Sequence, residues 1–301
     1  MSKYILGGGI AGLITAYYNP QYTIISDKIG GQMADTGLGP RILEINDNST
    51  KLLYDLGFEK IGMKVASVGY MINGRYISNL DNEQKINYYM KSRCLESRKN
   101  IPSSIMSDGK KHIRYWDIDW NDLIYRLMDG IQSTPIIGKI SHINTEKKKL
   151  KVDGITLEYD TLVSTIPAPL FFKLANEKPY KELTFVNKTF IIVPEFFDMK
   201  HFDYVYFPGP DVEYHRVTKL DNDRFAIEYT THRSSEDILG EWPDALNVKT
   251  LFAGQIQSGE IKVIDDVYYI GRFGCWDHDI KTDDVVFQAN LLKGIEEDMN
   301  D

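Results

Sequence analysis

The order of apolar and polar positions near the start of the chain predicts a strand, a helix and a second strand. Residues 4–6 form a short apolar run that indicates a buried strand, and residues 13–18 follow with a helical pattern. A further apolar run predicts a strand over residues 22–26. This alternation is typical of the first unit of a parallel α/β sheet.

Residues 116–131 predict an amphipathic helix, with Asp117 or Asp119 as its N-terminal cap. Large apolar residues recur at i, i+3 and i+4, so they share one face, which we expect to lie in the core. These residues are Trp120, Leu123, Ile124, Leu127, Met128 and Ile131.

The rest of the pattern favours strands. Residues 66–78 alternate around Asn73-Gly74, a strong signal for a two-residue turn, and predict a hairpin. Strands joined by turns are expected over 148–166, and an aromatic, strand-like stretch over 184–233 predicts an antiparallel sheet. Residues 82–111 are polar and show no clear period, so we expect irregular structure there.

Composition narrows the class of protein. The chain has 301 residues and a formal charge of −8, which argues against a globally basic nucleic-acid-binding protein. Its two cysteines, Cys94 and Cys275, are far apart and fit a reducing cytoplasm. No apolar run approaches the length of a membrane helix, and the six histidines show no metal-binding spacing, so we expect neither a membrane span nor a metal site.

A glycine motif follows the first predicted strand directly. In Gly7-x-Gly9-x-x-Gly12, the first glycine permits a tight turn, the second lets a pyrophosphate approach the backbone, and the third lets the helix pack closely. Ile10 and Ala11 open the helix, whose N–H groups and partial positive charge suit phosphate. The strand–turn–helix context therefore predicts a dinucleotide site.

The end of the second strand is where a ribose would be held. Ser26 and Asp27 occupy this region, and Asp27 is the better candidate because a carboxylate accepts hydrogen bonds from both ribose hydroxyls. Alternatively, Asp27 merely caps the loop.

Gly30-Gly31-Gln32 then gives a second glycine pair. A strand, an acidic residue and such a pair resemble flavoproteins of the amine-oxidase and UDP-galactopyranose-mutase superfamily, in which the pair wraps the pyrophosphate of FAD. The resemblance implies FAD rather than a nicotinamide cofactor.

Three further stretches support the resemblance. Residues 39–59 are similar to the segment after the glycine pair, and residues 162–174 to the strand that returns beside the cofactor. Residues 267–295 are similar to the terminal strand, loop and helix of the mutase branch. There the resemblance implies that Arg272, after Gly271, contacts the FAD phosphates and that the start of the last helix lies near the flavin ring. Asp283 or Asp284 opens this helix, and capping is favoured there over a role toward the ligand; Asp283 is still counted as a cofactor-binding candidate.

The implied fold is α/β, with a Rossmann-like FAD-binding domain and an interleaved antiparallel-sheet substrate domain. The FAD-binding domain is expected to comprise residues 1–65, 148–175 and 262–301. The substrate domain is expected to comprise residues 66–147 and 176–261.

No motif in the sequence announces a nucleophile, which is consistent with a reaction carried by the cofactor. Arg41 stands where mutases have a histidine near the flavin, and Arg216 aligns with an arginine that faces the substrate diphosphate, with an ion pair on a strand as its alternative. His215 should point to the other face of that strand. Trp276 and His278 stand where the family holds substrate with tyrosines. We count Arg41, Arg216, Trp276 and His278 as catalytic candidates.

The favoured function is an FAD-dependent enzyme that acts on a small anionic or nucleotide-bearing substrate by flavin redox or N5 chemistry, with a C–N bond favoured. A UDP-galactopyranose-mutase-type isomerase is the first alternative. A flavin-binding module without turnover is the second, together with a nucleic-acid modifier that docks through the basic segment 91–114. That segment also fits a solvated helix face and loop.

Overall fold

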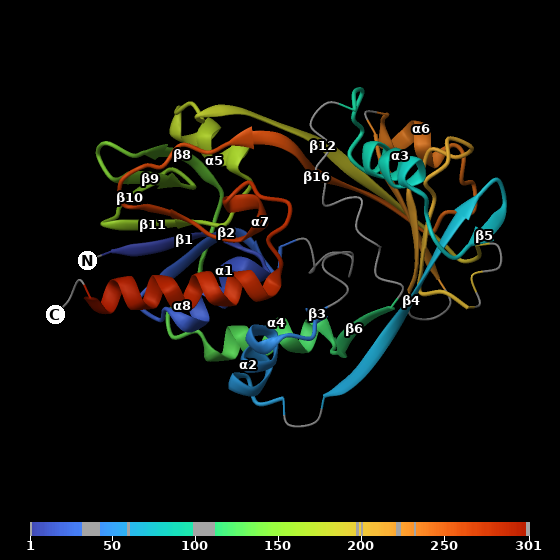
Figure 1. The fold of residues 1–301 in the computed structure, drawn as a ribbon. Helices are drawn as coiled ribbons and strands as arrows, with labels where there is room; N and C mark the ends of the chain where they lie inside the picture. Colours follow the sequence, from blue (N-terminus) through green and yellow to red (C-terminus); the bar gives the residue numbers. More distant parts are fainter. Residues whose placement is uncertain are drawn as a thin grey trace. The chain divides into compact units, whose positions relative to one another are not determined.

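The structure is a computed structural model, and it describes residues 2–31, 43–58, 61–98, 112–196, 199, 201–220, 224–231 and 233–298. The chain divides into two compact units (Figure 1). Unit 1 comprises Met1–Met63, Tyr115–Leu183 and Ser258–Asp301, and unit 2 comprises Lys64–Arg114 and Thr184–Gln257.

Unit 1 is built on a five-stranded sheet in the order β17-β11-β1-β2-β7. Every neighbouring pair in it is parallel. Its strands are β1 (Lys3–Gly8), β2 (Thr23–Ile29), β7 (Ile136–Ile137), β11 (Thr161–Ser164) and β17 (Val267–Tyr269). The predicted Rossmann-like sheet is therefore confirmed.

Apolar faces of several helices pack with this sheet into one core. The helices are α1 (Ile10–Tyr18), α2 (Asp47–Asp55), α4 (Trp120–Gly130) and α8 (Thr282–Asp298). The predicted apolar face of α4 is confirmed: Leu123 and Leu127 are fully buried and the other four apolar residues pack at the margin. The helix is shorter than predicted, because Asp119 caps it through the backbone N–H of Asn121 and residues 116–117 end the strand β6 instead.

Unit 1 also contains smaller elements. A three-stranded antiparallel sheet is formed by β8 (Ile140–Asn144), β9 (Lys149–Val152) and β10 (Ile155–Glu158). The remaining elements are β3 (Leu43–Glu44), which pairs with β6 (His112–Asp117), the helix α5 (Ala168–Ala175) and the short helix α7 (Gly271–Gly274). Residues 115–147, which we expected in the substrate domain, lie in this unit, because α4 buries its apolar face in the core of unit 1.

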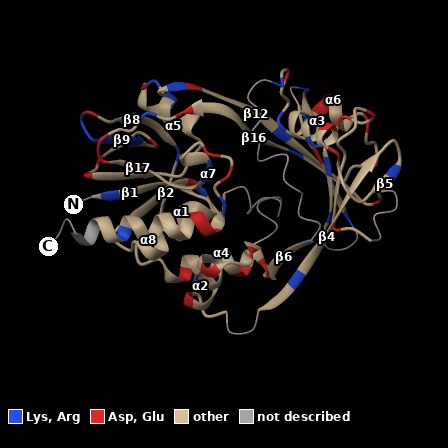
Figure 2. Cartoon of the chain, viewed as in Figure 1, with Lys and Arg blue, Asp and Glu red and all other residues tan. Residues whose placement is uncertain are grey.

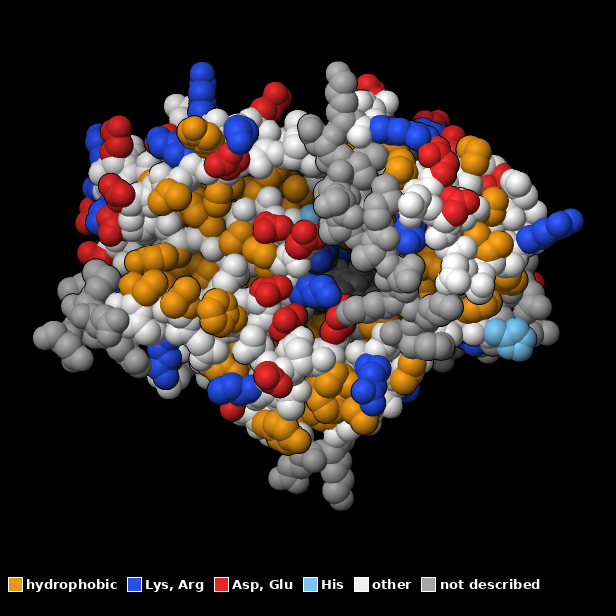
Figure 3. Space-filling view, viewed as in Figure 1, with side chains coloured by type: hydrophobic (Ala, Val, Ile, Leu, Met, Phe, Trp, Pro, Cys, Tyr) orange, Lys and Arg blue, Asp and Glu red, His pale blue; other side chains and the backbone are white. Residues whose placement is uncertain are grey.

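The outer face of α8 is also apolar. Phe287, Leu291 and Ile295 are exposed at i, i+4 and i+8, and apolar side chains gather over this helix in Figure 3. The inner face, with Val286 and Ala289, lies in the core. In contrast, acidic residues mark α2 and α4 (Figure 2). No helix among the described residues is long and apolar enough to cross a bilayer.

Unit 2 is built on a sheet in the order β16-β12-β15-β14-β13-β4, with β5 paired to β4. The strands are β4 (Gly62–Ile72), β5 (Arg75–Ile77), β12 (Lys181–Val193), β13 (Tyr204–Tyr206), β14 (Arg216–Lys219), β15 (Phe225–Thr230) and β16 (Asn247–Glu260), of which β4, β12 and β16 begin or end in unit 1. The predicted hairpin is confirmed, with positive φ at Asn73 and Gly74. The sheet is not purely antiparallel, because β13 pairs with β4 in parallel.

The described part of unit 2 also contains the helices α3 (Asn82–Ser92) and α6 (Ser235–Leu239). The sequence prediction of irregular structure was wrong for α3. None of its residues is fully buried, so the helix shows no apolar period. Asp81 and Gln84 form a capping box at its start, and this local signal could have revealed the helix.

Candidate cofactor-binding site

The first glycine motif forms the turn from β1 into α1. Gly7 has a φ of +107°, a conformation that side chains with a Cβ rarely adopt. A Cβ at Gly12 would fall far inside the shortest contact seen for real Cβ atoms, against the carbonyl oxygen of Gly7. Both glycines are therefore required by the packing of this chain itself.

Gly9 is different. Its φ of −75° and ψ of 179° suit any residue, and a Cβ there would meet no described atom within 4 Å. Gly9 is the N-cap of α1, where no side chain of the described residues caps the helix and no acidic residue occupies the first turn. The N–H groups at Ile10 and Ala11 thus lie at an uncapped helix start, beside space that the described chain leaves open.

The second glycine pair lies against the first motif. The backbone N–H of Gly30 donates to the carbonyl of Gly8 at 2.7 Å, and a Cβ at Gly31 would stand 2.9 Å from the Cα of Gly9. Gly30 and Gly31 both have positive φ. The structure therefore brings the two sequence motifs together at one place.

The C-terminal Gly-Arg turn joins the same place. Gly271 has a φ of +79°, and a Cβ there would come within 2.8 Å of the Cβ of Ala11. Its N–H donates to the side chain of Gln288 on α8 at 2.9 Å. Arg272 donates from Nε to the carbonyl of Ile280 at 3.1 Å, which ties the loop after α7. A contact from Arg272 to a phosphate stays a prediction.

The two ribose candidates differ in what their side chains do. Ser26 is buried, and its hydroxyl donates to the carbonyl of Lys28 at 2.8 Å, so it is used by its own loop. The side chain of Asp27 is exposed. Asp27 is thus the better placed of the two to accept from a ribose.

We call the place where the glycine turns at Gly7–Gly12, Gly30-Gly31 and Gly271 meet the cradle. Thr165 also belongs to it, and the sequence analysis did not identify this residue. It follows β11, its hydroxyl donates to the carbonyl of Leu6 at 2.9 Å, and its Oγ1 would lie 2.7 Å from a Cβ at Gly7. A small polar residue at the carboxyl end of a parallel strand was the available signal.

The contacts of Trp276 and the position of Asp283 are those of residues that stabilise the fold. The Trp276 side chain is 5% exposed, and its indole N–H donates to the carbonyl of Ser258 at 2.9 Å. Its φ of +56° places it in the left-handed region, where it ends α7. Asp283 lies in the first turn of α8, but the cap contact there is made by Asp284, which accepts from the N–H of Lys281.

Other predicted residues stand apart from the cradle or outside the described chain. Gln32 and Arg41 lie outside the described residues, and His278 is half-buried in the loop after α7. In the described part of the basic segment, Lys91 donates to two backbone carbonyls, Arg93 lies over the ring of Tyr89, and Arg98 pairs with Glu83. These engaged charges favour a surface role for that part of the segment.

Unit 2 holds a buried charge cluster that no sequence motif announced. The carboxylate of Glu228, 2% exposed, accepts from Lys188 at 2.6 Å and from Arg216 Nε at 3.0 Å, and Arg216 Nη2 is also bonded to it. His215 Nε2 lies 3.0 Å from the same carboxylate. The prediction that His215 and Arg216 diverge was wrong, because β14 begins only at Arg216 and the strand alternation does not extend to His215.

Burial and charge shift the pKa values in this cluster. Burial lowers the pKa of His215 to about 4, although the Glu228 carboxylate acts in the opposite direction, so the imidazole is neutral at pH 7. Burial alone would raise the pKa of Glu228, but Arg216 and Lys188 hold it well below its usual range. His215 Nδ1 is buried and has no hydrogen-bond partner among the described residues.

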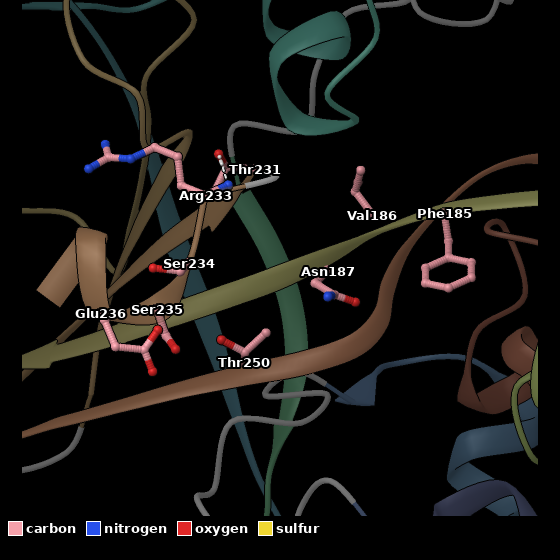
Figure 4. A pocket seen from close by; sticks show the side chains of 9 residues that line it. All are labelled: Phe185, Val186, Asn187, Thr231, Arg233, Ser234, Ser235, Glu236 and Thr250. Atoms are coloured by element: carbon pink, nitrogen blue, oxygen red, sulfur yellow. Dashed lines mark hydrogen bonds between the residues drawn. The ribbon is translucent and has the colours of Figure 1, made fainter.

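A pocket of about 460 Å³ lies elsewhere in unit 2, between β12, β16 and the start of α6 (Figure 4). Its lining is mostly hydroxyl and amide groups, and Arg233 turns its guanidinium away toward Glu213 and Glu241. None of the predicted site residues that the structure describes lines it.

Comparison with known proteins supports the fold. No protein-family model matches the chain, and no curated protein matches it in sequence. Among solved structures, a reduced UDP-galactopyranose mutase matches with a TM-score of 0.66 and 12% identity over 96% of this chain and 93% of that chain. A fatty acid isomerase from P. acnes matches with a TM-score of 0.68 and 12% identity over 96% and 97%. The chain shares their fold. A redesigned putrescine oxidase also matches, with a TM-score of 0.58 and 10% identity over 96% and 97%. The resemblance seen in the sequence is thus confirmed at the level of the fold.

Proposed function

We propose that the chain is an FAD-dependent enzyme whose unit 1 holds the cofactor. One observation carries this proposal: Gly9 has no conformational or packing reason within the described chain to be glycine, yet it stands at an uncapped helix start. A pyrophosphate beside that backbone would explain the missing side chain. The shared fold with a mutase, an isomerase and an oxidase supports the proposal.

Each residue of the cradle would contact a different part of the cofactor. The N–H groups at Ile10 and Ala11 would donate to the pyrophosphate, and Gly31 would leave room for it on the opposite side. Asp27 would accept from the ribose, and Arg272 would contact a phosphate. The bound flavin would supply the electron or N5 chemistry.

For the reaction itself, we propose a small anionic or nucleotide-bearing substrate and net redox chemistry, with a C–N bond favoured. The absence of any nucleophile motif in the sequence supports a step carried by the cofactor. The solved relatives bear the names of a mutase, an isomerase and a putrescine oxidase, so the fold accommodates several reactions and does not choose among them.

A comparison of two assays separates the candidate reactions. Oxygen consumption and flavin bleaching with a panel of primary and secondary amines would support oxidation at a C–N bond. Turnover of UDP-galactopyranose only by the dithionite-reduced protein would instead support the mutase alternative. Neither activity in a protein that binds FAD stoichiometrically would favour the module without turnover.

The nucleic-acid alternative makes a separate prediction. Binding of single-stranded RNA or DNA through the segment 91–114 would weaken steeply with salt, since it would depend on phosphate contacts. No salt-dependent retention in a filter-binding assay removes that alternative.

A further inference from the structure

The sheet of unit 2 carries polar residues in a single row on one face. Phe190 lies opposite Glu228, Glu228 opposite Arg216, and Arg216 opposite Tyr206. Tyr206 in turn lies beside Tyr70 on β4. Residues directly opposite one another on neighbouring strands point to the same side of a sheet, so these side chains share one face.

The other face is mainly apolar in this region, with the buried Thr189 as a polar exception. Ile191, Val205, Val217 and Ile227 are each one position from the row, and all four belong to one buried core cluster. The polar row is therefore not required for filling that core. It is a separate feature of the opposite face.

Aromatic rings continue the row beyond Arg216, on the side away from Glu228. Tyr70 and Tyr206 stack with ring centroids 5.9 Å apart, and Tyr88 of α3 meets Tyr206 edge-on at 5.1 Å. The hydroxyls of all three tyrosines make no hydrogen bond with described residues. Burial raises the pKa of Tyr70 and Tyr88, so both phenols are neutral donors at pH 7.

Only two of the three guanidinium nitrogens of Arg216 donate hydrogen bonds to described residues. Arg216 donates from Nε and Nη2 to Glu228, whereas Nη1 makes no hydrogen bond with a described residue. The Arg216 side chain is 30% exposed, although the carboxylate that it binds is 2% exposed. Glu228 thus holds Nε and Nη2 and leaves Nη1 without a described partner, on a strand position that lies directly opposite Tyr206.

We propose that Arg216 Nη1 and the hydroxyls of Tyr206, Tyr70 and Tyr88 form a recognition site for a single carboxylate of an organic acid. A carboxylate matches the planar N–H pair of a guanidinium, and the tyrosine rings provide apolar walls for an attached carbon chain. A diphosphate fits less well, because its further charge would need a second cation and the ammonium of Lys188 already donates to Glu228. The inference rests on the proposed function only in naming this acid as the substrate.

Binding is measured without turnover, by isothermal titration of the full-length protein with acetate, hexanoate and benzoate. Hexanol, which has the same chain without charge, and pyrophosphate serve as comparison ligands. We expect at least one carboxylate to bind, hexanol not to bind, and pyrophosphate to bind more weakly than the carboxylate. Binding of none of the three carboxylates, or tighter binding of pyrophosphate, overturns the proposal.

Two variants test which residues are responsible. Tyr206→Phe keeps the stacked ring and removes one hydroxyl, so the affinity for the carboxylate should fall about three- to ten-fold. Tyr125→Phe, at a 70% exposed position on α4, should leave it unchanged. An unchanged affinity in Tyr206→Phe contradicts the proposed donor set. Flavin content, read by absorbance in the same samples, shows separately whether the cofactor proposal has failed.

Discussion

Gly9→Ala and Gly12→Ala form a matched pair of substitutions within one motif, with opposite expected effects on folding. At Gly9 the backbone already has a conformation that alanine adopts, and the new Cβ meets no described atom. At Gly12 the same methyl group would overlap the carbonyl oxygen of Gly7. Only a bound ligand should make the first substitution harmful.

The magnitudes follow from these environments. In Gly9→Ala, the reduced freedom of the unfolded chain stabilises by about 0.4–1 kcal/mol, and the loss of a glycine N-cap offsets a similar amount. The apoprotein should therefore melt within about 2–4 °C of the wild type. Gly12→Ala forces the turn and helix apart and should lower stability by about 1–3 kcal/mol or more.

Gly9→Ala should weaken FAD binding, although it leaves the stability of the apoprotein nearly unchanged. A methyl group at Gly9 keeps a pyrophosphate from the N–H groups of α1, and hydrogen bonds to charged groups contribute about 1.5–3 kcal/mol. The dissociation constant for FAD should therefore rise by about 10- to 150-fold. Quenching of FAD fluorescence measures the affinity, and circular dichroism of the apoprotein measures the melting temperature.

Two results would refute this reasoning. If Gly9→Ala binds FAD as tightly as the wild type, the space beside Gly9 is not a pyrophosphate site. Alternatively, apo Gly9→Ala loses as much stability as Gly12→Ala, and then Gly9 is glycine for folding alone.

Three further predictions concern stability. Glu228→Gln leaves Lys188 and Arg216 without their carboxylate on a buried face and should lower the free energy of unfolding in urea by about 3–5 kcal/mol. Adding Lys188→Met should recover part of that loss. A loss below about 1 kcal/mol in Glu228→Gln would contradict the account. Trp276→Phe removes the hydrogen bond to Ser258 but keeps an aromatic ring, so we expect a loss of about 1 kcal/mol by the same method, and no loss would show that this bond is not stabilising. His215 has a folded-state pKa of about 4, below its usual 6.5. Its contribution to the free energy of unfolding is therefore fully present above pH 6.5 and is lost as the pH falls through 4, with a total loss of about 3 kcal/mol. The urea midpoint should fall less steeply between about pH 7.5 and 4.5 in His215→Gln than in the wild type, and equal slopes would refute this assignment.

The cradle was predictable from the sequence because the residues of its first turn lie close together along the chain. The motif Gly7–Gly12 follows a strand and opens a helix, and both parts lie within a few residues of each other. The second pair, Gly30-Gly31, returns to the first through one crossover of the parallel sheet, so its position follows from the topology.

The charge cluster of unit 2 was not predictable in the same way. Glu228 meets Arg216 only through the register of β14 and β15, and His215 reaches the same carboxylate because it precedes the strand. Trp276 shows the same limit, since a tryptophan with positive φ is stable here because its indole is buried and bonded to Ser258 at the end of β16. Such contacts depend on tertiary packing and leave no periodic signal along the chain.

The central claim is that unit 1 binds FAD, and its most direct test is the absorbance spectrum of the purified protein before and after titration with FAD. The account predicts flavin bands in stoichiometric amount that bleach on anaerobic reduction and return in air. A colourless protein that also takes up no added FAD would contradict it, and the open space at Gly9 would then require another ligand.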